Sequence, residues 1–61
     1  MNLRGLLKEK DLSAAWLARQ LGVSRQSVSN WCRGDEEPRL KHIRKIAEVF
    51  HMTIEEVLNY I

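Results

Sequence analysis

Apolar residues recur along this chain at spacings of three and four, the period of a helix with one buried face. They fall into five short groups separated by polar or glycine-containing gaps. The groups are Leu3, Leu6 and Leu7; Ala14, Leu17, Ala18 and Leu21; Val28, Trp31 and Cys32; Leu40, Ile43, Ile46, Ala47 and Phe50; and Ile54, Val57, Leu58 and Ile61. No stretch alternates apolar and polar residues as a half-buried strand does. The pattern predicts an all-α fold of five short helices, with an apolar stripe on each.

Small polar residues and glycines mark where these helices begin and end. Ser13 and Ser24 stand at N-cap positions, where a hydroxyl accepts a hydrogen bond from a free backbone N–H. Gly22 and Gly34 are placed to end the second and third helices, because glycine tolerates the left-handed conformation common there. Further boundary signals are Pro38, which precedes or opens the fourth helix, and a Thr53–Glu56 capping box before the fifth.

The second and third predicted helices are joined by residues 22–24, which leave room only for a tight turn. Two helices connected so closely cross at a steep angle, as in a helix-turn-helix. Ala18 permits the close crossing, Gly22 supplies a positive φ, and Val28 anchors the following helix inward. We therefore expect one domain over residues 1–61, with a helix-turn-helix over about residues 13–33.

Composition and charge narrow the class of protein. The chain has 61 residues, of which 44% are hydrophobic and 30% charged, as in an ordinary small globular domain. Its net charge of +2 is uneven: +4 over residues 1–33, −3 over 34–38, +4 over 39–45 and −3 over 46–61. Two basic blocks suit an anionic partner, although on charge alone a mixed, solvated surface is the simpler interpretation.

Several classes of site and location are not expected. No apolar run reaches the roughly 18 residues of a membrane span, and no export signal is visible. Cys32 is the single cysteine, which excludes an internal disulfide, favours a cytoplasmic location and predicts a small buried residue. Cys32, His42 and His51 lack the spacing of a zinc site, so no metal or cofactor is expected. The chain lacks a nucleophile–base motif, and we expect no enzyme activity.

The third predicted helix has an unusual choice of polar residues. Ser27, Ser29 and Asn30 are weaker helix formers than the Glu, Lys and Ala that suit a merely soluble helix. Their short hydrogen-bonding side chains indicate a surface selected for what it contacts. An exposed polar face without a partner is the alternative.

Short motifs run in order through nearly the whole chain. They are Leu17-Ala18, Leu21-Gly22-Val23-Ser24, Val28-Ser29-Asn30-Trp31, Gly34, Pro38, Leu40, Ile46-Ala47 and the segment 52–58. With these motifs the chain resembles the phage-repressor and Cro-type helix-turn-helix family, also called the Xre family. The resemblance implies a compact, lambda-repressor-like DNA-binding domain whose recognition helix, about residues 25–33, enters the major groove. The expected function is a sequence-specific transcriptional regulator, a repressor that blocks polymerase as a dimer on a two-fold operator.

The resemblance also implies which side chains touch DNA. Arg25 is able to pair with guanine through two hydrogen bonds, and Gln26 and Asn30 with adenine, while Ser29 shares their outward face. The expected base-contacting residues are Arg25, Gln26, Ser29 and Asn30. The expected phosphate-contacting residues lie at the starts of the second, third and fourth helices: Ser13, Ala14, Ser24, Ser27, Arg39 and Lys41, with Arg19 and Arg33 as weaker candidates.

The last helix is expected to form the dimer contact, through Ile54, Tyr60 and Ile61. The alternative is an antitoxin or coactivator-like protein whose main partner is another protein. Trp31 lies on an inner stripe and is expected in the core, whereas Trp16 either covers the core edge or marks a partner surface.

Four positions depart from the family pattern: Ala14, Leu7, Cys32 and Trp16, the last at a position that is usually polar. Many members have Gln at the position of Ala14, and Glu at the position of Cys32 paired with Arg at that of Leu7. An apolar contact between Leu7 and Cys32 is expected to replace that ion pair without loss of stability.

Overall fold

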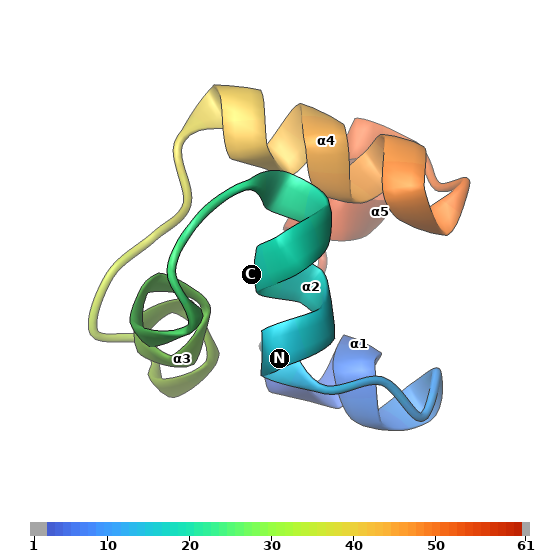
Figure 1. The fold of residues 1–61 in the computed structure, drawn as a ribbon. Coiled ribbons are helices and arrows are strands. Elements are labelled where there is room, and N and C mark those ends of the chain that lie inside the picture. Colours follow the sequence, from blue (N-terminus) through green and yellow to red (C-terminus); the bar gives the residue numbers. More distant parts are fainter. Residues whose placement is uncertain (1–2, 61) are drawn as a thin grey trace.

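The computed structural model describes residues 3–60, and every regular element in this range is an α-helix. The elements are α1 (Leu3–Glu9), α2 (Ala14–Leu21), α3 (Arg25–Arg33), α4 (Leu40–Phe50) and α5 (Ile54–Leu58). α2 packs against α3 and α4, α1 against α3, and α5 against α4. Figure 1 shows α4 lying across the end of α2, with α3 to one side of both. The predicted all-α, five-helix fold is confirmed.

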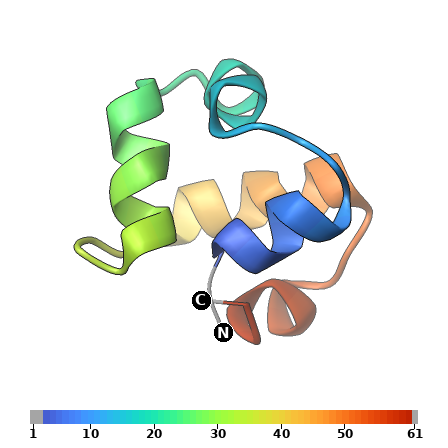
Figure 2. The same ribbon diagram turned by 90° about the horizontal axis from the view of Figure 1, so that it is seen from below.

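All five helices contribute side chains to one hydrophobic core. Figure 2 shows the helices arranged around this core, with α1 nearest the viewer. The largest side chains that are almost fully buried are Leu3, Leu6, Leu17, Val28, Ile46 and Val57. These residues stand at the predicted helical spacing, so each helix turns its apolar stripe toward the core.

The predicted helix ends at the central turn are confirmed. Ser13 Oγ accepts a hydrogen bond from the backbone N–H of Trp16, at 3.0 Å, and Ser24 Oγ accepts one from Ser27, at 3.1 Å. Gly22 follows α2 with φ of 70°, a left-handed conformation that favours glycine. The turn between α2 and α3 is therefore fixed by a glycine at one end and a serine cap at the other.

The boundaries of α4 and α5 also follow the sequence signals. Pro38 is buried and precedes α4, and Arg39 occupies its N-cap position without a side-chain cap. Thr53 and Glu56 form the predicted capping box, in which each side chain bonds to the backbone of the other residue, at 3.1 and 2.9 Å.

Two large apolar side chains of these helices are exposed, and for one of them the prediction of burial is wrong. Leu40 was expected on the buried stripe of α4 but is 56% exposed, because it is the first residue of the helix, at the edge of the stripe. Leu58, the last residue of α5, is 51% exposed. It follows the buried Val57, and one residue is about 100° of rotation around a helix.

The two tryptophans have different surroundings. Trp31 is buried at 7% exposure, as predicted. Trp16 is half-buried and lies against Phe50 of α4, with ring centroids 5.9 Å apart. Trp16 therefore covers the edge of the core, in agreement with the first of its two interpretations. Among the helices of residues 3–60, none has the length and apolar character needed to cross a bilayer.

Candidate nucleic-acid interface

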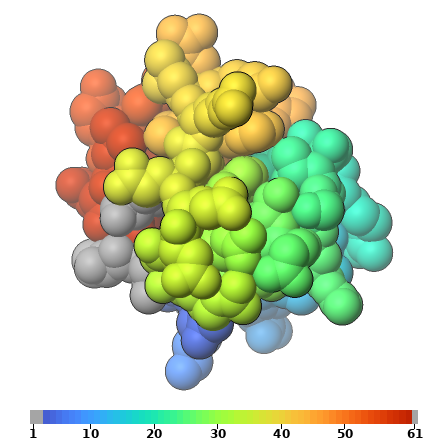
Figure 3. Space-filling view, turned by 90° about the vertical axis from the view of Figure 1, so that its left-hand side faces the viewer, coloured from blue at the N-terminus to red at the C-terminus, as the bar shows by residue number. Residues whose placement is uncertain are grey.

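α3 is held firmly at its inner face and presents a polar outer face. Val28 is fully buried, and Trp31 and Cys32 are nearly so. Arg25 and Gln26 are exposed near the start of the helix, and Ser29 and Asn30 are half-buried. The predicted base-contacting residues thus share one helix, and two of them are open to solvent. Figure 3 shows the neighbouring part of the surface, where the C-terminal end of α3 meets the loop that leads to α4.

Arg25 and Ser29 lie in different surroundings. The guanidinium of Arg25 makes no hydrogen bond or ion pair with any residue of 3–60, so all its donors remain available. Ser29 instead lines an open pocket of about 550 Å³ between α1, the loop that follows α1, the start of α2 and α3. Ser29 therefore lies toward the side of the face, beside Ser13 and Ala14, which line the same pocket.

The amide of Asn30 is the centre of a hydrogen-bond network. Its Oδ1 accepts hydrogen bonds from Gln26 Nε2, at 2.9 Å, and from an Nη of Arg33, at 2.6 Å. Its Nδ2 donates to Oε1 of Glu36, at 2.9 Å. Two predicted base-contacting residues are thus bonded to each other, and one of them is bonded to the acidic loop. Sequence reasoning missed this role of Glu36, and the acidic run after Gly34 was the available signal.

Backbone contacts fold the acidic loop back on α3. The carbonyl oxygen of Asn30 accepts hydrogen bonds from the N–H groups of Asp35 and Glu36, at 3.0 and 3.4 Å. Gly34 makes this reversal with φ of 80°. Arg33 Nε pairs with a carboxylate oxygen of Asp35 at 3.0 Å, which uses part of its charge within the protein. Arg33 is accordingly a weaker phosphate candidate than the unpaired cations.

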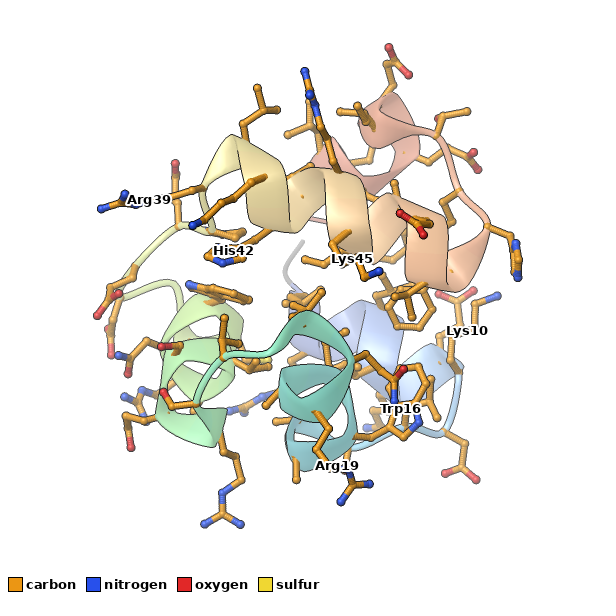
Figure 4. All side chains as sticks on the ribbon, turned by 45° about the horizontal axis from the view of Figure 1, so that its top comes forward. Lys10, Trp16, Arg19, Arg39, His42 and Lys45 are labelled. Carbon is orange, nitrogen blue, oxygen red and sulfur yellow. The ribbon has the colours of Figure 1, made fainter. Side chains whose placement is uncertain are left out.

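The predicted phosphate-contacting residues lie at three helix starts. Ser13 with Ala14 and Ser24 with Ser27 begin α2 and α3, and the two hydroxyls of the second pair are 3.0 Å apart. Arg39 and Lys41, at the start of α4, are exposed and form no ion pair with the described residues. Figure 4 shows Arg39 and Arg19 extending away from the body of the protein at different places, so they do not form one cluster.

His42 of α4 lies beside Trp31 of α3, with ring centroids 5.2 Å apart. Its Nδ1 is buried and has no hydrogen-bond partner among residues 3–60. Burial lowers the pKa of His42 below its usual value, and the positive charges of Lys41 and Arg39 lower it further. The neutral imidazole is therefore the form that fits this position.

Leu7 and Cys32, which were expected to be in apolar contact, both belong to the hydrophobic core. Both are almost fully buried and line the pocket beside α3. Burial raises the pKa of the Cys32 thiol, while the charge of Arg4 opposes this effect. The thiol is thus protonated and free, as in a structural cysteine. Within residues 3–60, no three His, Cys, Asp or Glu side chains are grouped to hold a metal ion.

The predicted dimer-contact residues are only partly available. Ile54 and Tyr60 are half-buried and pack against the core, and the Tyr60 hydroxyl donates to a carboxylate oxygen of Glu9, at 2.9 Å. Ile61 lies outside the described residues. Leu58 of α5 is exposed, and it was not proposed as a dimer contact from the sequence. Its position directly after the inward-facing Val57 was the available indication that it points outward.

Fold and surface together define a helix-turn-helix domain, and comparison with known proteins shows the same class. A family model described as helix-turn-helix matches residues 3–57, so the chain belongs to this Xre/Cro-like family. It is similar to the HTH-type transcriptional activator BcrR of Enterococcus faecalis, with 37% identity over 57 residues, covering 93% of this chain and 28% of that protein. A crystal structure of a transcriptional regulator from Listeria innocua matches 98% of this chain, with a TM-score of 0.88 and 30% identity.

Both relatives are longer than the region they share with this chain. The chain spans 28% of the length of the activator and 56% of the solved regulator. The similarity therefore concerns the helix-turn-helix domain, and both proteins that carry it are named as transcriptional regulators.

Proposed function

We propose that this chain binds double-stranded DNA at specific sequences and regulates transcription, with α3 in the major groove. The observation that carries this proposal is the two-sided character of α3. Its inner face is locked by Val28 and Trp31, whereas Arg25 and Gln26 project from its first turn into solvent. In a helix-turn-helix, the side chains near the start of the second helix are the ones that contact base edges. Arg25 and Gln26 occupy these positions in α3.

Arg25 is the strongest candidate for a base contact. Its guanidinium has no partner among the described residues and is able to donate two parallel hydrogen bonds to O6 and N7 of guanine. Gln26 retains its Oε1 and one N–H after bonding to Asn30, which is the pair of groups that adenine requires. Ser29 and Asn30 complete the proposed base-contacting set, at the side and at the end of this face.

Phosphate contacts are proposed on either side of α3. Ser13 and Ala14 present the start of α2, Ser24 and Ser27 present the start of α3, and the partial positive charge of helix N-termini favours phosphate. Arg39 and Lys41 add two unpaired cations at the start of α4. These groups bind every sequence alike, so they position the domain and leave discrimination to α3.

A homodimer on a two-fold operator is the proposed assembly. One module covers only a few base pairs, and two modules about one helical turn apart contact two half-sites. Ile54, Tyr60 and Ile61 are the proposed contact, together with Leu58, whose side chain is 51% exposed on α5. Repression by blocking polymerase remains the proposed mode. One relative of this chain is named as an activator, so the sign of regulation is the part of this proposal that a transcription assay tests.

Fluorescence anisotropy with duplex DNA tests the proposed function. We expect Arg25→Ala and Gln26→Ala each to weaken specific binding by about 1–3 kcal/mol. Lys10→Ala is the matched control for Arg25→Ala, because it removes the same charge from an exposed position in the turn just after α1 (Figure 4). Equal affinities for Arg25→Ala and Lys10→Ala would contradict the proposal and favour a protein as the main partner.

A further inference from the structure

The hydrogen-bonding capacity of Asn30 is nearly exhausted within the protein. An asparagine amide has two acceptor positions on Oδ1 and two N–H donors on Nδ2. Gln26 and Arg33 occupy both acceptor positions, at 2.9 and 2.6 Å, and Glu36 takes one of the two donors, at 2.9 Å. One N–H of Asn30 is all that remains for DNA.

This arrangement changes what Asn30 is able to recognise. An asparagine that selects adenine accepts from the N6 amino group through Oδ1 and donates to N7 through Nδ2. Oδ1 of Asn30 has no free position for the N6 amino group while Gln26 and Arg33 bond to it. The single remaining N–H fits N7 of either purine and O4 of thymine, so by itself it discriminates poorly.

The hydrogen bond that occupies Oδ1 of Asn30 also orders the side chain of Gln26. Its Nε2 donates to Asn30 and so the amide is fixed in one orientation, with Oε1 and the second N–H left over. A free glutamine on a helix surface samples several rotamers, and ordering it on binding DNA costs conformational entropy. The bond to Asn30 makes the Gln26 amide a preorganised contact for one base.

We propose that Glu36 is a positioning residue for sequence recognition, which holds the Asn30 amide so that Asn30 fixes Gln26 instead of selecting a base itself. The inference rests on the proposed DNA binding of α3. Backbone hydrogen bonds hold Glu36 beside Asn30, because the N–H groups of Asp35 and Glu36 both donate to the Asn30 carbonyl oxygen. The Glu36 carboxylate is the acceptor for Asn30 Nδ2, so without it the Asn30 amide is held through its Oδ1 alone, by Gln26 and Arg33, and is less firmly fixed.

Glu37 offers a matched control. It is the next residue of the same exposed loop, carries the same charge and makes no hydrogen bond or ion pair with any residue in the described range. Glu36→Ala, Glu36→Gln and Glu37→Ala each remove one negative charge near DNA, so all three gain similar nonspecific affinity. Only Glu36→Ala also removes the acceptor, because a glutamine Oε1 is still able to accept from Asn30.

The test is selection of bound sequences from a randomised duplex pool for the full chain and each variant. Gln26→Ala first identifies the base position that depends on Gln26. We expect Glu36→Ala to reduce discrimination at that position about tenfold and to leave the position that depends on Arg25 unchanged, while Glu36→Gln and Glu37→Ala keep the original preference. Thermal melting confirms that every variant is folded.

Two results would overturn the inference, and they are distinguishable from failure of the proposed function. Unchanged base preference in Glu36→Ala means that Glu36 does not position the network. A common change in Glu36→Ala, Glu36→Gln and Glu37→Ala means that loop charge is responsible. If the unaltered chain selects no sequence, DNA recognition by α3 is itself wrong and the role of Glu36 is rejected with it.

Discussion

The indole of Trp31 and the imidazole of His42 lie with ring centroids 5.2 Å apart and planes inclined by 38°. Trp31 comes from α3 and His42 from α4, so this pair joins two consecutive helices. Figure 4 shows His42 on the side of α4 that faces α3. One of the contacts between α3 and α4 therefore involves a titratable group.

Acidification is expected to destabilise the fold through His42. Unfolded histidine has a pKa of about 6.5, and burial beside Lys41 and Arg39 lowers the pKa of His42 in the folded state. The unfolded state therefore binds more protons, and stability present above about pH 6.5 is lost as the pH falls toward the folded value. Urea denaturation at pH 7.5 and pH 5 should show a lower midpoint at pH 5.

Two substitutions distinguish the contribution of His42 to this pH dependence from that of His51. His42→Phe keeps an aromatic ring against Trp31 and should reduce the difference between the two pH values. His51→Asn, at the exposed C-cap of α4, should retain it, since asparagine also tolerates the positive φ of 56°. The same pH dependence in His42→Phe and in the unaltered chain would show that His42 is not the responsible group.

The capping box of α5 is expected to contribute measurably to stability. Thr53→Ala removes the hydroxyl that accepts from the Glu56 N–H, at 3.1 Å, and should lower the free energy of unfolding by about 1 kcal/mol. Thr53→Ser keeps an acceptor at the same place and is expected to restore most of the loss. Chemical denaturation of both variants measures the difference, and equal stability of the two would contradict a role for the hydroxyl.

Gly22 is required for its backbone conformation alone. A Cβ added there meets no atom within 4 Å, so Gly22→Ala creates no clash. The φ of 70° nevertheless disfavours alanine, and we expect a loss of about 1 kcal/mol in the free energy of unfolding. Gly22→Asn should be less harmful, because asparagine visits the left-handed region more readily. Thermal melting of the two variants tests the order.

Lys41 is expected to act on all DNA sequences alike. Lys41→Gln should weaken specific and nonspecific binding equally and reduce the slope of log affinity against log salt by about 1. Lys45→Gln, on the same helix, is the control for charge, because Lys45 pairs with Glu48 at 3.6 Å. A specificity change in Lys41→Gln, or equal slopes in the two variants, would contradict a phosphate contact.

Much of the fold was predictable because its signals are local. The caps at Ser13, Ser24 and Thr53 depend on residues three positions apart, and the left-handed ends at Gly22 and Gly34 depend on one residue each. The helical period placed Val28 and Trp31 inside without knowledge of their partners. These features follow from the sequence because each is decided within one or two helical turns.

The parts that sequence reasoning missed depend on how segments meet. Burial of Leu40 and Leu58 depends on where each helix end lies relative to the core, which periodicity alone does not specify. The bond from Asn30 to Glu36 joins a helix to a loop across six positions, and only the folded turn at Gly34 brings them together. Asn30 was predicted to contact a base because of its residue type. Its hydrogen bond to Glu36 follows from the path of the folded chain, which the residue type does not indicate.

Selection from a randomised duplex pool with the unaltered chain and Arg25→Ala tests the central claim most directly. The account predicts a two-fold symmetric site for the unaltered chain, with a base preference that is lost in Arg25→Ala. Weak binding with a steep salt dependence and no enriched sequence would contradict it, because phosphate contacts alone produce that behaviour. Enrichment of the same site by Arg25→Ala would equally contradict base recognition through the first turn of α3.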